Sequence, residues 1–369
     1  MNKEEMVKKV AEHLINKSVR LEKGENLLID INNIDSLPLV YAIIDEVRKK
    51  EANVFTNVFH SKLNAKLLKN TNKDEVSILA DIDEYRMKKM DAFIGITSSS
   101  NKYNLKNIDS EILNMYSAEH TYKVHLKERV ENTKWCILNY PTELAAENFK
   151  MDDDEMFEFW ANANTIDYED LAKKAMLLKE LMDNTDRVRI VGKNTDLYFS
   201  IAGINATPCF GTYNLPDGEM FTAPIRDSVN GYINYNTKTM YNGVEFENIF
   251  FRFENGKIIE AYSEINNDKL QAILDLDDGA RYIGEFAIGL NPKIHNLVNN
   301  TLYDEKIVGS FHFTPGSALS ESDNGNRSKI HWDIVYLEKA DEESKMYFDD
   351  RLIREKGQFI IEELKVLNA

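Results

Sequence analysis

The first half of the chain alternates short apolar runs with longer stretches in which apolar residues recur at helical spacing. Four runs rich in β-branched and aromatic residues predict strands at residues 27–31, 54–59, 92–96 and 135–138. Each interval between them is long enough for a helix, and residues 36–52 carry the apolar spacing of one. Because strands joined by helices usually pair in parallel, this half is predicted to be an α/β domain with a parallel sheet.

The pattern changes after a helix that is predicted from residue 168 to about residue 182. Strand-like runs follow, among them RVRIVG, DLYFSIAG, YIGEFAIGL, KIHWDIVYL and KGQFIIEEL, and Asn255-Gly256 is a β-hairpin turn signal. We therefore predict a boundary near Asp186. Residues 1–185 would form the α/β domain, and residues 186–369 would form a mostly antiparallel, β-rich α+β domain that carries the catalytic site.

Composition and charge narrow the function classes. Among 369 residues, 62 Asp and Glu outweigh 45 Lys and Arg, which gives a formal net charge of −17. A charge of this sign argues against nucleic acid or an anionic membrane as a main partner. The N-terminal helix is charged throughout and no long uncharged apolar run occurs, so the expected location is the cytoplasm. Two cysteines are too few for a disulfide framework or a thiolate metal site.

Polar residues interrupt apolar, strand-like runs at four places in the second half. A tight turn at Asp217-Gly218 presents Glu219, Glu285 interrupts the run IGEFAIGL, and His312 stands between two phenylalanines. The fourth place is KIHWDIV, residues 329–335, which reads as a strand. Alternate residues of a strand share a face, so His331 and Asp333 are predicted to point to the same spot.

Each of these residues also has an ordinary structural explanation. Glu219 could pair with Arg226, Glu285 could pair with Arg281, and His312 could be a hydrogen-bonded core histidine. Taken together, two Glu, two His and one Asp form the nitrogen and oxygen ligand set typical of zinc, cobalt or manganese. Five ligands exceed what one tetrahedral catalytic ion needs, and they suffice for two ions if a carboxylate bridges.

The same motifs carry a family resemblance. PDGEMFTAPIRDSVNG, IGEFAIGLNP, GSFHF and KIHWDIV resemble, in this order, the aminopeptidase T family of metallo-aminopeptidases, also described as thermophilic-type leucyl aminopeptidases. The resemblance covers essentially the whole chain. It implies that a pair of divalent metal ions is bound by Glu219, Glu285, His312, His331 and Asp333. It further implies a homodimer whose enclosed cavity limits access to short peptides.

We therefore expect a metal-dependent aminopeptidase that releases N-terminal residues from short peptides with a free N-terminus. Two ions of zinc, cobalt or manganese would activate a water molecule, and Glu219 or Glu285 would accept its proton. Three alternatives remain open: a non-enzymatic or inactive metal-binding dimer, a two-metal hydrolase of another ester or amide, and a single-ion site. One departure bears on activity, because Leu319 stands where other members of the family have a tyrosine. Tyr232 or Tyr336 could take its place.

Overall fold

The computed structural model describes residues 1–98 and 108–369, and the chain forms two compact units. Unit 1 comprises residues 1–165 and 211–215, and unit 2 comprises residues 166–210 and 216–369. The units thus divide after Thr165, earlier than the predicted boundary near Asp186. The reason is that helix α9 (Tyr168–Asp183), although correctly predicted as a helix, packs against strands of unit 2.

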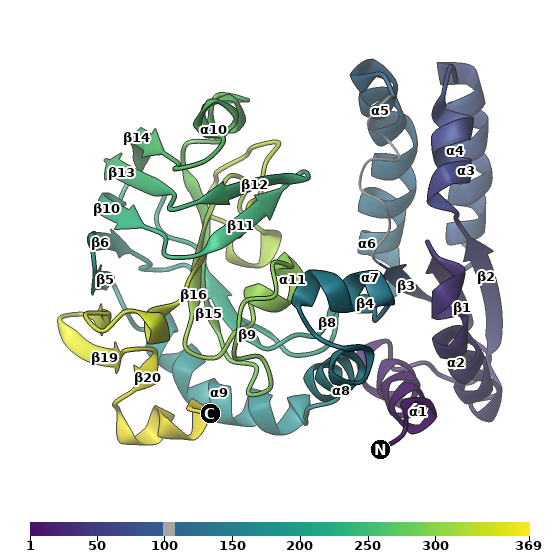
Figure 1. Ribbon diagram of the computed structural model, residues 1–369, viewed down its shortest axis with the longest axis horizontal. Helices are drawn as coiled ribbons and strands as arrows, with labels where there is room; N and C mark the ends of the chain where they lie inside the picture. The colour runs from purple at the N-terminus through teal and green to yellow at the C-terminus, as the bar shows by residue number, and fades with distance from the viewer. Residues whose placement is uncertain (99–107) are drawn as a thin grey trace. The chain divides into compact units, whose positions relative to one another are not determined.

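Unit 1 is built on a five-stranded parallel sheet with the strand order β2-β1-β3-β4-β8 (Figure 1). Its strands are β1 (Asn26–Ile31), β2 (Asn53–Val58), β3 (Ala92–Ser98), β4 (Lys134–Tyr140) and β8 (Asn214–Leu215). The first four match the four predicted strands. The apolar run of β3 is buried because the strand lies inside the sheet, whereas β2 lies at an edge and is largely exposed. The predicted parallel sheet is therefore confirmed.

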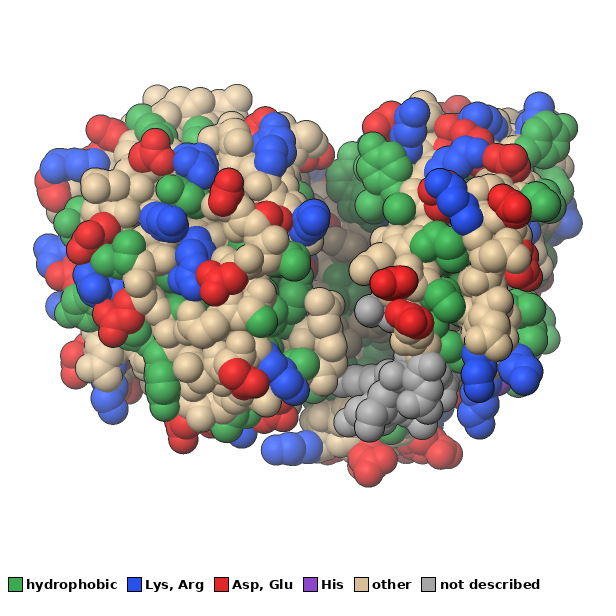
Figure 2. Space-filling model, turned by 90° about the horizontal axis from the view of Figure 1, so that it is seen from above, with side chains coloured by type: hydrophobic (Ala, Val, Ile, Leu, Met, Phe, Trp, Pro, Cys, Tyr) green, Lys and Arg blue, Asp and Glu red, His purple; other side chains and the backbone are tan. Residues whose placement is uncertain are grey.

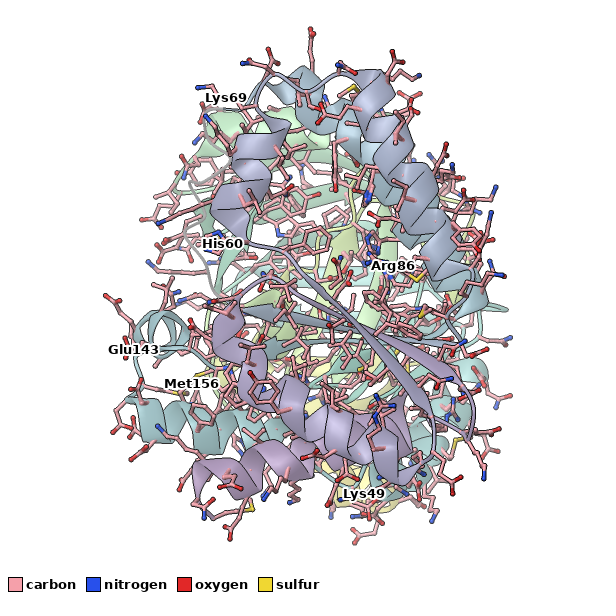
Figure 3. All side chains as sticks on the ribbon, turned by 90° about the vertical axis from the view of Figure 1, so that its right-hand side faces the viewer. Lys49, His60, Lys69, Arg86, Glu143 and Met156 are labelled. Atoms are coloured by element: carbon pink, nitrogen blue, oxygen red, sulfur yellow. The ribbon has the colours of Figure 1, made fainter. Side chains whose placement is uncertain are left out.

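Helices follow the strands of unit 1 as the spacing predicts. Figure 3 looks onto this unit and labels Lys49 at the end of α2, and His60 and Lys69 at the two ends of α3. The N-terminal helix begins in a capping box in which Asn2 and Glu5 each accept from the other's backbone N–H. The α-helices are α1 (Lys3–His13), α2 (Leu37–Lys49), α3 (Ser61–Leu68), α4 (Lys73–Met87), α5 (Ser110–Tyr116), α6 (Val130–Asn132), α7 (Glu143–Phe149) and α8 (Asp153–Asn164), with η1 (Leu14–Ser18), η2 (Ile34–Ser36) and η4 (Ser117–Arg129) beside them.

Unit 2 contains an eight-stranded antiparallel sheet with the order β14-β13-β10-β6-β5-β18-β19-β20. Asn255 and Gly256 both have positive φ at the turn between β13 and β14, which confirms the predicted hairpin. The strands are β5 (Arg187–Gly192), β6 (Thr195–Ser200), β10 (Asn230–Asn234), β13 (Phe250–Glu254), β14 (Lys257–Tyr262), β18 (Lys345–Phe348), β19 (Arg351–Glu355) and β20 (Gln358–Phe359).

A five-stranded antiparallel sheet, β17-β16-β15-β9-β7, packs against the eight-stranded sheet. Phe199 of the large sheet meets Phe286 and Phe313 of the small sheet at ring-centroid distances of 5.1 and 5.0 Å, so the core of the unit lies between the two sheets. The strands are β7 (Thr207–Cys209), β9 (Glu219–Thr222), β15 (Ile283–Gly289), β16 (Phe311–Pro315) and β17 (Val335–Tyr336). Unit 2 also contains a hairpin of β11 (Lys238–Tyr241) and β12 (Val244–Glu247). Its further elements are the helices α10 (Asn267–Leu274) and α11 (Thr301–Asp304) and the 3-10 turns η5 (Ser320–Ser322), η6 (Glu338–Ala340) and η7 (Glu362–Leu367).

Two predicted strands are shorter in the structure than in the sequence pattern. In KIHWDIV, regular pairing is confined to β17, and His331 makes an isolated bridge with Gly316. The neighbouring strand β16 ends at Pro315, which has no N–H to donate to a continuing ladder. In KGQFIIEEL the strand is limited to β20, and η7 begins three residues after it, at Glu362.

The acidic excess is not gathered in one place on the face that Figure 2 shows. There, acidic and basic side chains are interspersed over both units. Among the helices that the structure describes, we find none with the length and hydrophobicity required to cross a membrane.

Candidate metal centre

Side chains alternate between the two faces of the small sheet, and this separates the apolar core residues from the candidate ligands. On β15 and β16, Phe286 and Phe313 face the large sheet, so Glu285 and His312 point to the opposite face. Ala287 is the register partner of His312, which makes Glu285 and His312 diagonal neighbours across the two strands. Both side chains are buried. Glu285 and His312 thus share one face of the small sheet.

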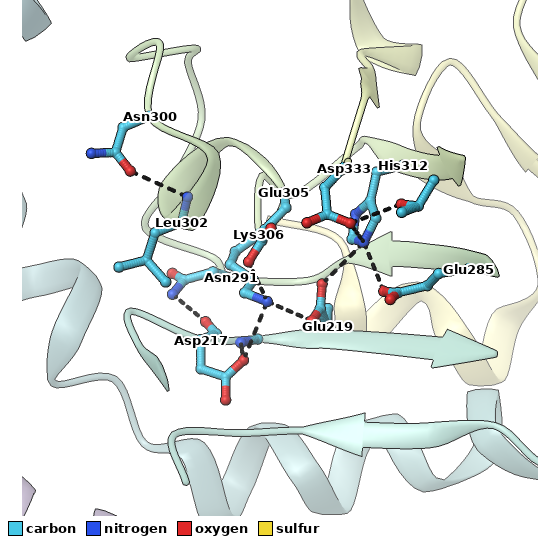
Figure 4. Close-up of polar contacts among 12 residues, drawn as sticks. Asp217, Glu219, Glu285, Asn291, Asn300, Leu302, Glu305, Lys306, His312 and Asp333 are labelled. Carbon is cyan, nitrogen blue, oxygen red and sulfur yellow. Dashed lines mark hydrogen bonds and ion pairs between the residues drawn. The ribbon is translucent and has the colours of Figure 1, made fainter. Parts of the chain in front are cut away.

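The five predicted residues converge on one place in unit 2. Nε2 of His312 lies 3.0 Å from Oε1 of Glu285, 3.6 Å from Oε2 of Glu219 and 4.0 Å from Oδ1 of Asp333 (Figure 4). Nε2 of His331 lies 3.3 Å from Oε2 of Glu285 and 3.2 Å from Oδ1 of Asp333. Glu285 therefore turns one carboxylate oxygen to each imidazole.

His331 and Asp333 are held in place although their segment is not a regular strand. Trp332 between them is buried, where Tyr241 and Phe246 pack on its indole at centroid distances of 4.8 and 4.9 Å. The backbone N–H of Trp332 donates to the carbonyl of Pro315, which keeps the segment extended. Alternation consequently persists, and the prediction that His331 and Asp333 point to the same spot is confirmed by their 3.2 Å contact.

Neighbouring polar groups orient these two side chains. Nδ1 of His331 lies 2.9 Å from the carbonyl oxygen of Ser317, which can only accept, so Nδ1 donates and Nε2 is left facing the carboxylates. The hydroxyl of Thr314 donates to Oδ1 of Asp333 at 2.8 Å. The side chains of His331 and Asp333 are 29% and 17% exposed, so solvent reaches the cluster on their side.

The ordinary explanations for the two glutamates fail. Arg226 stacks on the ring of Tyr282 and donates to Asn326, and Arg281 forms its ion pair with Asp275. Neither arginine pairs with Glu219 or Glu285 in the described part of the structure. A cation does contact Glu219, but it is Lys306, whose Nζ lies 2.5 Å from Oε1.

Sequence reasoning missed Lys306 and its neighbour Glu305. Lys306 also lies 2.9 Å from Glu305 and 3.7 Å from Asp217, so its ammonium contacts three carboxylates. The run Asp304-Glu305-Lys306 directly before the apolar Ile307-Val308 was the available signal, but a charged run is usually solvated and nothing in it indicates burial.

The arrangement shifts the pKa values of both histidines upward. Burial works to lower the pKa of His312, but its hydrogen bond with Glu285 and the charges of Glu219, Glu285 and Asp333 raise it to about 9. Burial likewise works to lower the pKa of His331, yet Asp333 and Glu285 raise it well above its ordinary value. Burial works to raise the pKa of Asp333, but His331 and His312 hold it well below its ordinary value. Without metal ions, the two imidazoles therefore join the ammonium of Lys306 as cations of this cluster.

The tyrosines proposed as substitutes lie in other settings. Tyr336 is buried, stacks on Phe311 and donates its hydroxyl to Asp341, and Tyr232 is an exposed residue of β10. Tyr241, which stacks on Trp332, was not singled out in the sequence. Burial raises its pKa, while His331 and Asp333 act on it in opposite directions, so its hydroxyl lies close to the cluster.

The donor set fits divalent metal ions. Glu219, Glu285 and His312 offer three ligand atoms within 4.8 Å of one another, and Glu285, His331 and Asp333 offer another three. Oε2 of Glu219 is buried and has no hydrogen-bond partner among the described residues, as expected of an atom that awaits a cation. None of the five residues lines either of two surface hollows, one in unit 1 beside Tyr140 and Met156 and the other in unit 2 beside Arg189 and Tyr198.

Comparisons with known proteins agree with the resemblance read from the motifs. Aminopeptidase T of Thermus thermophilus is 37% identical over 119 residues, which are 31% of this chain and 29% of that protein. Aminopeptidase AmpS of Bacillus subtilis is 32% identical over 126 residues, 33% of this chain and 30% of that protein. These alignments thus span about 30% of the length of either relative.

The likeness in three dimensions extends further. The solved structure of wild-type AmpT from Thermus thermophilus matches with a TM-score of 0.80 at 22% identity and covers 98% of this chain and 100% of that one. At this identity it establishes a shared fold, an α/β unit with a parallel sheet and an antiparallel, sheet-rich unit. A family model described as thermophilic metalloprotease (M29) matches residues 3–359. Because that model spans nearly the whole sequence, the chain belongs to the thermophilic metalloprotease (M29) family.

Proposed function

We propose that this protein is a metal-dependent aminopeptidase that binds two divalent ions and releases N-terminal residues from short peptides. The observation that carries the proposal is the division of the five residues into two ligand groups that share Glu285. The first group is Glu219, Glu285 and His312, and the second is Glu285, His331 and Asp333. A shared carboxylate is what two neighbouring ions require when five ligands serve both.

The roles of the side chains follow from their contacts. Glu285, with one oxygen toward each imidazole, is the candidate bridge, and Glu219 would bind through Oε2, which has no hydrogen-bond partner among the described residues. A pair of divalent ions, when bound, would polarise the scissile carbonyl and lower the pKa of a water molecule toward neutrality. Glu219 and Glu285 are the candidate proton acceptors for that water, and either one could return the proton to the leaving amine only through an oxygen that a metal ion or Lys306 does not occupy during that step.

The proposed pair of ions favours a substrate with a free amino terminus. A free amine can bind a metal ion through its nitrogen, whereas an acetylated nitrogen cannot. The cations around the cluster do not suit phosphate esters. Arg226 and Arg281 are engaged elsewhere, and the ammonium of Lys306 is taken up by carboxylates, so none of these cations is available to a phosphate.

The test is hydrolysis of Leu-, Phe- and Arg-linked chromogenic amides after chelation and re-addition of zinc, cobalt or manganese. We expect activity to vanish on chelation and to return with at least one metal. Substitution Glu285→Gln should abolish turnover, whereas the matched substitution Glu260→Gln, at an exposed carboxylate of β14, should not change it. Acetylating the amino group of the substrate should also abolish turnover.

Two results would favour the rival functions. Metal uptake without hydrolysis of any of the three amides would point to a non-enzymatic metal-binding protein. Equal cleavage of free and acetylated substrates would refute an exopeptidase. Four features stay predictions. Metal analysis would test zinc, cobalt or manganese as the native metal, and sedimentation would test the homodimer. Cell fractionation would test the cytoplasmic location, and a series of peptides of increasing length would test the preference for short peptides.

A further inference from the structure

Lys306 is a buried cation at the edge of the proposed metal centre. Its side chain is 2% exposed, and the long aliphatic stem and ammonium group are rarely buried so completely without partners. The partners are Oε1 of Glu219 at 2.5 Å, Oε1 of Glu305 at 2.9 Å and Oδ1 of Asp217 at 3.7 Å (Figure 4). One ammonium thus faces three carboxylates, more than it can neutralise.

The fold brings the backbone of Lys306 to this position through a glycine. Gly289 ends β15 and is the register partner of Glu219 on β9. A Cβ at Gly289 would lie 2.3 Å from the carbonyl oxygen of Ile307 and 2.9 Å from the carbonyl carbon of Lys306, so the segment can pack there because no side chain is present. The backbone N–H of Asn291 donates to the carbonyl of Lys306 at 3.0 Å and fixes the segment.

The ammonium divides the two oxygens of Glu219 between two tasks. Oε1 is held by Lys306, whereas Oε2 faces His312 at 3.6 Å and has no hydrogen-bond partner in the part of the chain that the structure describes. A carboxylate can bind a metal through one oxygen or through both. With Oε1 engaged, the oxygen that remains for an ion is Oε2.

We propose that Lys306 is a positioning residue that restricts Glu219 to binding a metal ion through Oε2 alone. This inference rests on the proposed function, because it requires an ion beside Glu219 and His312. Its consequence is that one coordination position, which the second oxygen of Glu219 would otherwise fill, is kept open for water or substrate, as a catalytic metal site requires. The charge of Lys306 also keeps Glu219 from donating its full negative charge to the ion, so the ion stays a stronger Lewis acid.

The direct test is a crystal structure of the wild-type protein loaded with cobalt or zinc. We expect one oxygen of Glu219 on the metal and the ammonium of Lys306 still on the other oxygen. Both oxygens of Glu219 on metal, with Lys306 displaced, would overturn the inference while leaving the proposed function intact. A wild-type protein that binds no divalent ion would overturn both.

The functional test is the substitution Lys306→Met, which keeps the length of the stem and removes the charge. If Lys306 holds Glu219 to one oxygen, the variant should keep its cobalt, and the visible absorption of the bound cobalt should weaken because its coordination number rises. We expect kcat for a Leu-amide to fall at least about tenfold with a smaller change in KM. A role in stability alone predicts lost metal or an unchanged cobalt spectrum, and either result would count against the inference.

Arg354→Met is the matched control. Arg354 is also a buried cation of unit 2, 1% exposed, and it pairs with Glu338 at 2.7 Å, which is not among the five candidate ligands. The folded control should keep the wild-type cobalt spectrum. If its spectrum changes as that of Lys306→Met does, loss of any buried cation explains the effect and the inference fails. If Lys306→Met does not fold, the structure of the loaded wild type still decides.

Discussion

Binding of metal ions to the metal-free protein should release protons, and the structure sets how many. In the absence of metal, His312 has a pKa of about 9 and the pKa of His331 is also raised well above its ordinary value. Both imidazoles are therefore protonated at pH 7. A histidine must lose a proton from the nitrogen that binds a metal ion, so each should give up one proton when the proposed pair of ions binds.

The number of protons released distinguishes this arrangement from two histidines with ordinary pKa values. We expect about two protons released per chain at pH 7, whereas two histidines with a pKa of 6.5 would release about half a proton in total. Burial raises the pKa of Glu305 to about 8, so this carboxyl group can add up to one more. Raising the pH from 6 to 7 should strengthen the combined binding of two ions about 100-fold, which corresponds to about 2.7 kcal/mol.

The metal is first removed with a chelator. Isothermal titration calorimetry of this metal-free protein with zinc, in buffers of different ionisation enthalpy, then measures the number of protons released per chain. The control is His295→Ala, which removes an exposed histidine of unit 2 and should leave the number unchanged. Release of fewer than about one proton at pH 7, or zinc affinity that does not change between pH 6 and 7, would refute the assignment of His312 and His331 as protonated, mutually close ligands.

The same pKa values set the stability of the metal-free protein. Because the pKa of His312 is higher in the folded protein than in the unfolded chain, its contribution is fully present below about pH 6.5 and is lost as the pH rises through about 9. That contribution is about 3 kcal/mol. The metal-loaded protein should show the opposite trend over this range, since deprotonation favours metal binding and the bound ions stabilise the folded state.

Three further predictions concern single side chains. Thr314→Val removes the hydrogen bond to Asp333 and should weaken zinc binding about tenfold, as measured by competition with a chelating dye, while unfolding in urea changes little. Trp332→Ala opens a cavity beneath His331 and Asp333 and should cost about 3–5 kcal/mol in urea unfolding, with Trp332→Phe much milder; equal stability of the alanine variant would contradict the packing described. Glu285→Gln should lower kcat at least about 100-fold and reduce the metal content per chain, and a variant that keeps two ions would rule out a bridging role.

The sequence singled out the five candidate residues because they break strong local rules. Glu285 and His312 interrupt apolar runs whose period of two is fixed by burial, which made them visible in the pattern, whereas their shared face follows from the pairing of β15 with β16. The parallel sheet of unit 1 was predictable for a similar reason, since its apolar strands alternate with helical stretches. His331 and Asp333 converged as predicted although the expected strand is mostly absent, because burial of Trp332 preserves the alternation that ladder hydrogen bonds do not.

What the sequence could not provide depends on tertiary contacts. Helix α9 has the pattern of any amphipathic helix, and its membership of unit 2 follows from its partners rather than from its own residues. Lys306 lies in no regular strand and is distant in sequence from Glu219. Its burial depends on the absent side chain of Gly289, and neither the lysine nor the glycine signals the other along the chain.

The count of charges connects the proton prediction with the proposed pair of ions. Asp217, Glu219, Glu285, Glu305 and Asp333 act on one another electrostatically, and Lys306 is the cation within contact of three of them. Five carboxylates and one ammonium leave four negative charges, which two divalent ions with neutral histidines would balance and one ion would leave half compensated. Buried charge without compensation is costly, so in the absence of ions protons must take their place, first on His312 and His331 and then on Glu305. The raised histidine pKa values thus follow from the excess of carboxylates in the cluster, and they agree with the proposed pair of ions.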